Sequence, residues 1–143
     1  MFNSVLLAVD LSAESTWTKA LPIAVSMAER NNAPLHVVTV MPDFGMSIVG
    51  TFFEAGFEDR ALHDLGERLR EWVAENITAG IEVHPHVLLG RVYEQILEAA
   101  NAVSADVIVM ASHRPELTDY LLGPNAARVV RHATQSVFVV RGS

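Results

Sequence analysis

Candidate ligand-binding residues are concentrated in the last third of the chain, between Asp106 and Arg141. The apolar run 107–111 is followed directly by the polar segment 112–116, and Gly123-Pro124-Asn125 precedes a segment with helical periodicity. A short apolar run of this kind predicts a strand that is buried on both faces of a parallel sheet. Ligands of such sheets bind beyond the carboxyl ends of the strands. We therefore expect the polar segment and the start of the helix to form the walls of a binding site.

An anion is the ligand that this arrangement favours. A helix start offers unpaired N–H groups and the positive end of the helix dipole, and Arg114 could form two hydrogen bonds with a phosphate. The glycine-rich motifs of P-loop and dinucleotide-binding proteins are absent, since Asp10-Leu11-Ser12 follows the first predicted strand. A glycine before a helix is also a common turn, so the residues alone leave both interpretations open.

Catalytic and metal-binding patterns are weaker. Ser12 and Ser112 lack the strand-turn-helix elbow of hydrolases, so no catalytic turnover is expected. His84 and His86 alternate along a predicted strand and share a face, as two metal ligands would. No third ligand is evident near them, and we expect both to lie on the solvent side of the sheet.

Five strands and four helices must position these residues. The predicted strands are 4–9, 35–40, 81–89, 106–111 and 136–141, and the predicted helices run from Ser12 or Ser15 to 31 and over 57–78, 91–102 and 124–132. Strand and helix alternate, which predicts an α/β fold with a parallel sheet. Pro124 suits the first turn of a helix. The irregular, apolar segment from Met41 to Glu58 is expected to fold over a site or a neighbouring subunit.

Length and composition limit the classes of function. The chain has 143 residues, which we expect to form a single domain over 1–143, and half of them are hydrophobic. No apolar run approaches the roughly 18 residues of a membrane span, and we expect no signal peptide and no membrane insertion. The chain has no cysteine, and its net charge of −7 disfavours nucleic acid as a partner. These features predict a cytoplasmic location.

Several short motifs, in their order and spacing, resemble the universal stress protein family along the whole chain. The chain opens on Val5-Leu6-Leu7-Ala8-Val9-Asp10-x-Ser12, and its third strand ends in Gly90 before a helix. The closing block contains Val109-Met110-Ala111-Ser112-His113-Arg114, Leu121-Leu122-Gly123, Val129-Val130-Arg131-His132-Ala133 and Val137-Phe138-Val139-Val140. The resemblance implies an open five-stranded parallel sheet of order 3-2-1-4-5 with helices on both faces, Rossmann-like or adenine nucleotide alpha hydrolase-like.

The resemblance also implies a nucleotide site, although this chain departs from the usual motif. Many members bind ATP through Gly-x-x-Gly, a spacer, and Gly-Ser or Gly-Thr, and others do not bind it. Here Ala111 and Arg114 occupy the first two glycine positions, while Gly123 keeps the third and Pro124 replaces the Ser or Thr. Pro124 removes a hydroxyl and an N–H donor, and Asn125 could compensate through its side-chain amide.

The residues that the resemblance assigns to ATP or ADP, with or without Mg²⁺, are Val9, Asp10, Val40, Met110, Ala111, Ser112, His113, Arg114, Gly123, Pro124 and Asn125. Asp10 matches an acidic position near the adenosine, from which it could contact Mg²⁺ indirectly, and Val40 matches the position whose backbone reads adenine. Each also has a local interpretation: Asp10 could cap or hydrogen-bond its own loop, and Val40 and Met110 could simply be core residues.

The terminal strand is the predicted homodimer interface, because an apolar strand at a sheet edge requires a partner or a cover. Its residues are Val137, Phe138, Val139 and Val140. The sequence thus predicts a dimeric universal stress protein whose nucleotide-bound state regulates contact with an unidentified protein partner. Two alternatives remain, a non-nucleotide interaction module with a degenerate pocket and a weak ATPase.

Overall fold

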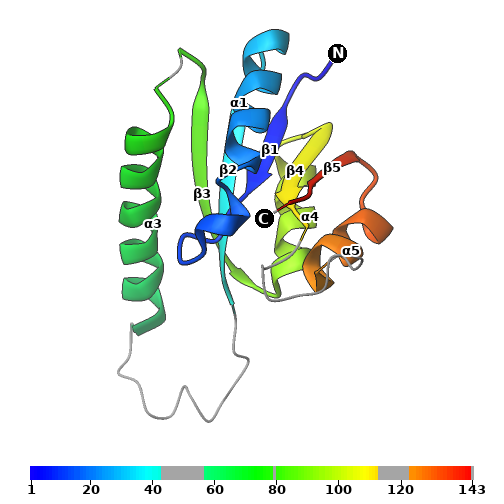
Figure 1. Ribbon diagram of the computed structural model, residues 1–143. Coiled ribbons are helices and arrows are strands. Elements are labelled where there is room, and N and C mark those ends of the chain that lie inside the picture. The colour runs from blue at the N-terminus through cyan, green and yellow to red at the C-terminus, as the bar shows by residue number, and fades with distance from the viewer. Residues whose placement is uncertain (43–56, 79, 113–122, 143) are drawn as a thin grey trace.

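The computed structural model describes residues 1–42, 57–78, 80–112 and 123–142. In chain order, its elements are β1 (Val5–Ala8), the short 3-10 helix η1 (Glu14–Thr16), α1 (Ala20–Asn31), β2 (Leu35–Pro42), α3 (Phe57–Asn76), β3 (Val83–Gly90), α4 (Val92–Ala102), β4 (Val107–Ala111), α5 (Pro124–His132) and β5 (Ser136–Val140). All five strands pair in parallel into one sheet of order β3-β2-β1-β4-β5. The predicted fold class and strand order are confirmed (Figure 1).

Helices cover both faces of the sheet. One hydrophobic cluster joins α1 and α3 to alternate strand residues that include Leu7, Val37 and Val109. The other joins α4 and α5 to the intervening residues, which include Leu6 and Ile108. Because successive side chains of a strand point to opposite faces, the continuous apolar runs of β1 and β4 supply both clusters at once.

The start of the first helix differs from its sequence prediction. Neither Ser12 nor Ser15 caps it; α1 begins at Ala20, and no side chain caps either α1 or η1. The Thr16 hydroxyl donates to the carbonyl of Ala13 (2.7 Å) and accepts the N–H of Asp10 (3.0 Å). Such side-chain bonds compete with helical backbone pairing, and they hold the segment after β1 in a turn.

Strand bounds differ from the predictions by one or two residues. The largest extension is in β2, which continues past Val40 because Met41 and Pro42 pair with Leu89 and Gly90 of β3. At the amino end of β1, the Asp106 carboxylate accepts hydrogen bonds from the N–H groups of Asn3 (2.7 Å) and Ser4 (3.2 Å).

None of the helices among the described residues is long and apolar enough to cross a membrane.

Gly90 closes β3 in a conformation that side-chain-bearing residues avoid. Its φ is +144°, and a Cβ placed there would lie 2.9 Å from Nε2 of Gln95 and 3.1 Å from its Cδ. Gly80 is a matched position, because no heavy atom lies within 4 Å of a Cβ built on it. Only glycine adopts a φ near that of Gly90 without strain, which explains why a glycine stands between β3 and α4.

We therefore expect Gly90→Ala to lower the free energy of unfolding by about 1–3 kcal/mol. Gly80→Ala should leave it unchanged or raise it by up to about 1 kcal/mol. Urea unfolding followed by circular dichroism measures both. Equal unfolding midpoints for the two variants would contradict the strain assigned to Gly90.

Candidate functional site

The candidate site lies at the carboxyl edge of the sheet, where all five parallel strands end; β1 and β2 run downward toward this edge in Figure 1. Leu7 of β1 pairs with Val109 of β4, and Ala111 pairs with Val140 of β5. The chain leaves β1 toward β2 on one side, while β4 lies on the other side. Strand order thus reverses at β1, and such a reversal is where open α/β sheets bind ligands.

Asp10 holds the turn that follows β1. Its Oδ1 accepts hydrogen bonds from both the N–H (3.0 Å) and the hydroxyl (2.6 Å) of Ser12. This is the local interpretation of Asp10, in which an aspartate stabilises its own turn. The carboxylate lies at the carboxyl edge, and contact with an adenosine there stays a prediction.

A second connection joins the end of β4 to the start of α5. Ser112 is buried, with 2% of its surface exposed, and its N–H donates to the carbonyl of Val140 (2.9 Å). The Ser112 carbonyl in turn accepts the N–H of Gly123 (2.6 Å). Gly123 has an ordinary φ of −60°, so its role here is not to supply a left-handed turn. These bonds fix where α5 begins.

The start of α5 has the donors that an anion site needs. Pro124 occupies the first turn, as predicted, and no side chain caps the helix. The first helical hydrogen bond runs from Ala127 to Gly123 (3.0 Å). The N–H groups of Asn125 and Ala126 precede it and therefore have no acceptor within the helix. Pro124 removes one N–H donor from the start of α5. The N–H groups of Asn125 and Ala126 and the positive end of the helix dipole are still present there.

Three other predicted site residues pack in the interior. Val9 and Met110 are each 6% exposed, and Val40 is half-buried against the cluster beneath α4 and α5. Their side chains therefore act as core residues, and any contact with a base stays a prediction. His113 and Arg114 lie outside the described residues, as does most of the segment 41–58.

The sequence did not point to a cation that lies near this edge. A Cβ on Gly142, just after β5, would lie 2.6 Å from Nζ of Lys19. Lys19 was expected within a helix, but it precedes α1 as its N-terminal cap residue. Lys19 and Gly142 come together only because β5 pairs with the rest of the sheet. Local sequence patterns do not encode such a contact between distant segments.

The terminal strand β5 lies at the edge of the sheet, as predicted. Phe138 is 43% exposed, whereas Val140 is buried and Val137 and Val139 are half-buried. An exposed phenylalanine on an edge strand suits pairing with a second chain. Only part of the predicted dimer interface is therefore accessible, with Phe138 as its most exposed apolar side chain.

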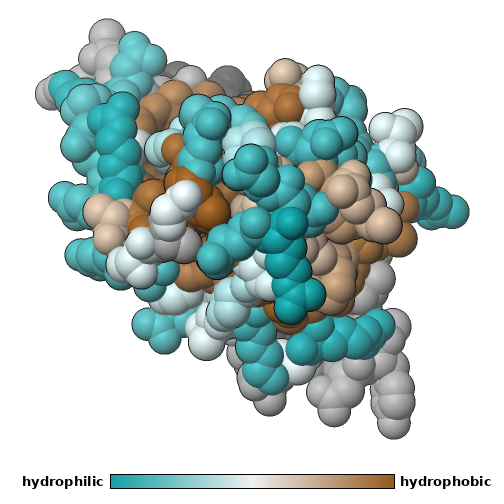
Figure 2. Space-filling model, turned by 90° about the horizontal axis from the view of Figure 1, so that it is seen from above, coloured by the Kyte–Doolittle hydropathy of each residue, from teal (hydrophilic) through white to brown (hydrophobic). Residues whose placement is uncertain are grey.

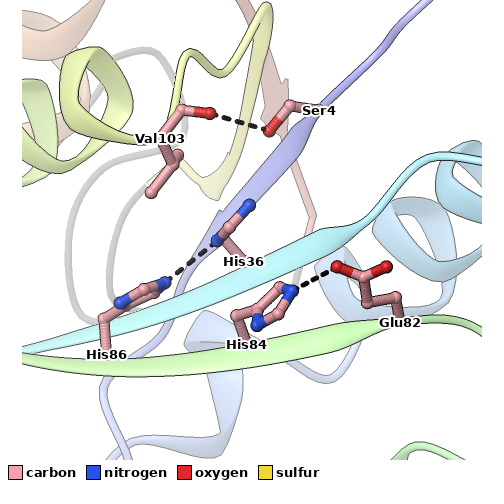
Figure 3. A network of polar contacts seen from close by, with 6 residues as sticks. All are labelled: Ser4, His36, Glu82, His84, His86 and Val103. Carbon is pink, nitrogen blue, oxygen red and sulfur yellow. Dashed lines mark hydrogen bonds and ion pairs between the residues drawn. The ribbon is translucent and has the colours of Figure 1, made fainter.

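The two strand histidines have a third neighbour that the sequence did not indicate. His84 and His86 lie half-buried on the face covered by α4, and His36 of β2 contacts both rings (Figure 3). The sequence predicted two solvent-side histidines with no third ligand evident; the structure leaves 45% of the His84 side chain exposed, and it adds His36 as a neighbour because the pairing of β2 with β3 aligns His36 with His84. Among the described residues, no group of three or more His, Cys, Asp or Glu could hold a metal ion.

Comparisons with known proteins agree with this architecture. A family model described as the universal stress protein family matches residues 1–141. Universal stress protein G of Salmonella typhimurium is 31% identical over 143 residues, covering 99% of this chain and all of that protein. The protein of the same name from Shigella flexneri is 30% identical over the same shares of the two chains.

Solved structures share the fold at lower identity. Universal stress protein UspA from Lactobacillus plantarum has a TM-score of 0.76 at 20% identity, over 97% of both chains. A universal stress protein in complex with cAMP has a TM-score of 0.68 at 19% identity, over 99% of this chain and 98% of the other. The universal stress protein from Archaeoglobus fulgidus in complex with dAMP has a TM-score of 0.57 at 21% identity, over 96% of both. With the family match over nearly its whole length, this chain belongs to the universal stress protein family.

Proposed function

We propose that this protein binds ATP or ADP at the carboxyl edge of its sheet and acts as a nucleotide-regulated, homodimeric stress-response protein of the cytoplasm. The start of α5 supports this function most directly. Because the N–H of Gly123 donates to the carbonyl of Ser112, the N–H groups of Asn125 and Ala126, which no carbonyl of the helix accepts, are fixed at the start of α5 beyond the end of β4. Fixed N–H donors at a helix start bind phosphate without reorganisation.

Relatives supply the chemical class of the ligand. Two solved family members hold cAMP and dAMP, and both molecules combine adenine with a phosphate. In this chain, the phosphates would meet the start of α5 together with Arg114, and the adenosine would lie toward Asp10 and Val40. Mg²⁺, when bound with a triphosphate, would neutralise part of the phosphate charge, and the Asp10 carboxylate is a ligand type that Mg²⁺ accepts.

Regulation follows if nucleotide binding favours one arrangement of the site over another. A ligand shifts a conformational equilibrium only by its difference in affinity for the two states. Residues 113–122 connect the end of β4 to α5, and they include Arg114. A nucleotide bound at both ends of this segment would select the arrangement that a partner protein recognises.

The competing function is an interaction module that binds no nucleotide. Two observations favour it: Pro124 lacks the N–H that the usual motif provides, and Ser12 already occupies Oδ1 of Asp10 with two bonds. The two functions differ in whether the pocket retains a nucleotide, so a binding measurement separates them.

Purified protein should bind ATP or ADP, and Arg114→Ala combined with Gly123→Val should weaken binding at least about tenfold. A hydrogen bond to a charged group contributes about 1.5–3 kcal/mol, and each 1.4 kcal/mol is about tenfold in affinity. Isothermal titration calorimetry measures the affinity, after analysis of small molecules released by denaturing the protein.

The matched control is Arg131→Ala combined with Gly80→Val. Arg131 is exposed in the last turn of α5, and Gly80 has open space around it. If the variant that combines Arg114→Ala with Gly123→Val does not fold, Arg114→Ala alone is used in the binding measurement. No co-purified nucleotide and no binding heat in the parent protein would reject nucleotide binding and leave the interaction module.

A phosphate-release assay tests the alternative of a weak ATPase. Rates of phosphate release equal to those in buffer alone would reject it.

For the dimer, Phe138→Glu should convert the protein to monomer. A charge on the edge strand opposes pairing with a second copy, and Phe138 is exposed enough for the monomer to tolerate it. Val130→Glu is the control, since Val130 on α5 is similarly exposed at 46%. Light scattering coupled to gel filtration gives the mass. A monomeric parent protein, or a dimeric Phe138→Glu variant, would reject this interface.

A further inference from the structure

We propose that His36, His84 and His86 form an acid-sensitive clasp that joins β2 to the edge strand β3 near neutral pH and loosens that strand as the pH falls. Among the described strands, β3 has one neighbour, β2, and pairs with it along its whole length. Proteins open locally where few contacts hold a segment, and an edge strand has fewer ladder bonds than a central one. The histidines lie nearer the amino ends of both strands, so the clasp requires no nucleotide at the carboxyl edge.

The hydrogen bond between His36 and His86 depends on one ring being neutral. Nδ1 of His36 and Nε2 of His86 lie 2.9 Å apart, and the ring centroids are 5.2 Å apart with the planes at 23°. The two rings therefore meet end to end across the strands (Figure 3). In such a bond one nitrogen donates its N–H and the other accepts with a lone pair. When both rings are protonated every ring nitrogen carries an N–H, so acid removes the acceptor and breaks the bond.

Acid also places like charges side by side. The ring centroid of His84 lies 5.0 Å from that of His36, so His36 lies between two other imidazoles. The Glu82 carboxylate contacts Nε2 of His84 (Figure 3). The side chain of Glu82 is 67% exposed, however, and solvent screens its charge. One exposed carboxylate therefore does not neutralise three protonated rings, and their repulsion opposes the pairing of β2 with β3.

The neighbouring elements supply no further compensating charge. By their charge, only the histidines themselves and Glu82 shift the pKa of either ring of the hydrogen-bonded pair. α4 covers this face of the sheet; its Glu94 and Glu98 are exposed, and its Tyr93 ring lies against α5. At the amino end of β1, the Asp106 carboxylate already accepts two backbone N–H groups. α1 and α3 cover the opposite face.

Protons can reach the cluster from solvent. The side chain of His84 is 45% exposed, and His36 and His86 are half-buried. Figure 2 shows the molecule from above Figure 1, the side on which β1 and β2 begin, and hydrophilic side chains cover most of that view. The rings are thus buried enough to keep a fixed geometry and exposed enough to titrate.

The direction of the pKa shifts gives the pH range of the effect. Burial lowers the pKa of His36 below its ordinary value of 6.5, as do His86 and His84, against an opposing effect of Glu82. Burial and then His84 lower the pKa of His86. Both rings therefore bind protons less readily in the folded chain than in the unfolded chain. The free energy of unfolding should be highest above about pH 6.5 and fall as the pH falls through that value and through the lowered pKa values.

Hydrogen exchange at about pH 7.5 and about pH 5 tests the clasp. After correction for the intrinsic effect of pH, protection of the β3 amides in the parent should fall at least about tenfold more than that of β1 and β4. A variant that combines His36→Gln with His86→Gln keeps polar side chains that acid cannot charge, so this difference should disappear. His63→Gln, at an exposed position on α3, is the matched control and should behave as the parent does.

A second measurement needs no variant. Nuclear magnetic resonance of the imidazole nitrogens follows each ring through the titration, and His36 and His86 should both titrate below pH 6.5. The proposal is overturned if either ring titrates at or above that value. It is overturned equally if β3 of the parent keeps its protection at about pH 5, if β1 and β4 lose protection together with β3, or if β3 of the His36→Gln, His86→Gln variant loses protection as in the parent.

Discussion

The burial of β1 on both faces is the constraint on which the rest of the molecule depends. Val5, Leu6 and Leu7 have no exposed surface, and fully burying such side chains contributes about 1.5–3 kcal/mol each. A strand buried in this way must pair all of its backbone N–H and C=O groups within the protein, which β1 does with β2 and β4. Because both pairings are parallel, all three strands end at one edge, and this places Asp10 and Ser112 on the same side of the sheet.

The features that the sequence predicted are those that depend on local patterns. Continuous apolar runs identified β1 and β4, because a two-sided core leaves no polar face to interrupt them. Pro124 marked the start of α5, since it occupies a position where the missing N–H breaks no helical bond. Strand order required the family resemblance, because alternation of strand and helix alone allows several orders.

The features that the sequence missed depend on contacts between distant or competing groups. α1 begins after the predicted caps because Thr16 bonds the backbone around Asp10 instead, and propensities do not show which of two local hydrogen-bonding schemes prevails. His36 and His86 are 50 residues apart, and only the register between β2 and β3 brings them together. Lys19 was likewise placed within a helix because the helix start was predicted too early, and its position beside Gly142 depends on the distant C-terminal segment.

The interior of the sheet separates its two ends. Backbone N–H donors lie at the carboxyl edge, where an anion is stabilised, and the rings of His36, His84 and His86 lie nearer the amino ends of β2 and β3. β2 extends from one edge to the other, from His36 to Val40. Between these residues Val37 and Val38 are fully buried and pair with strands on both sides, and a close-packed interior of this kind does not deform by small amounts. A ligand at one edge therefore cannot shift β2 gradually against its neighbours.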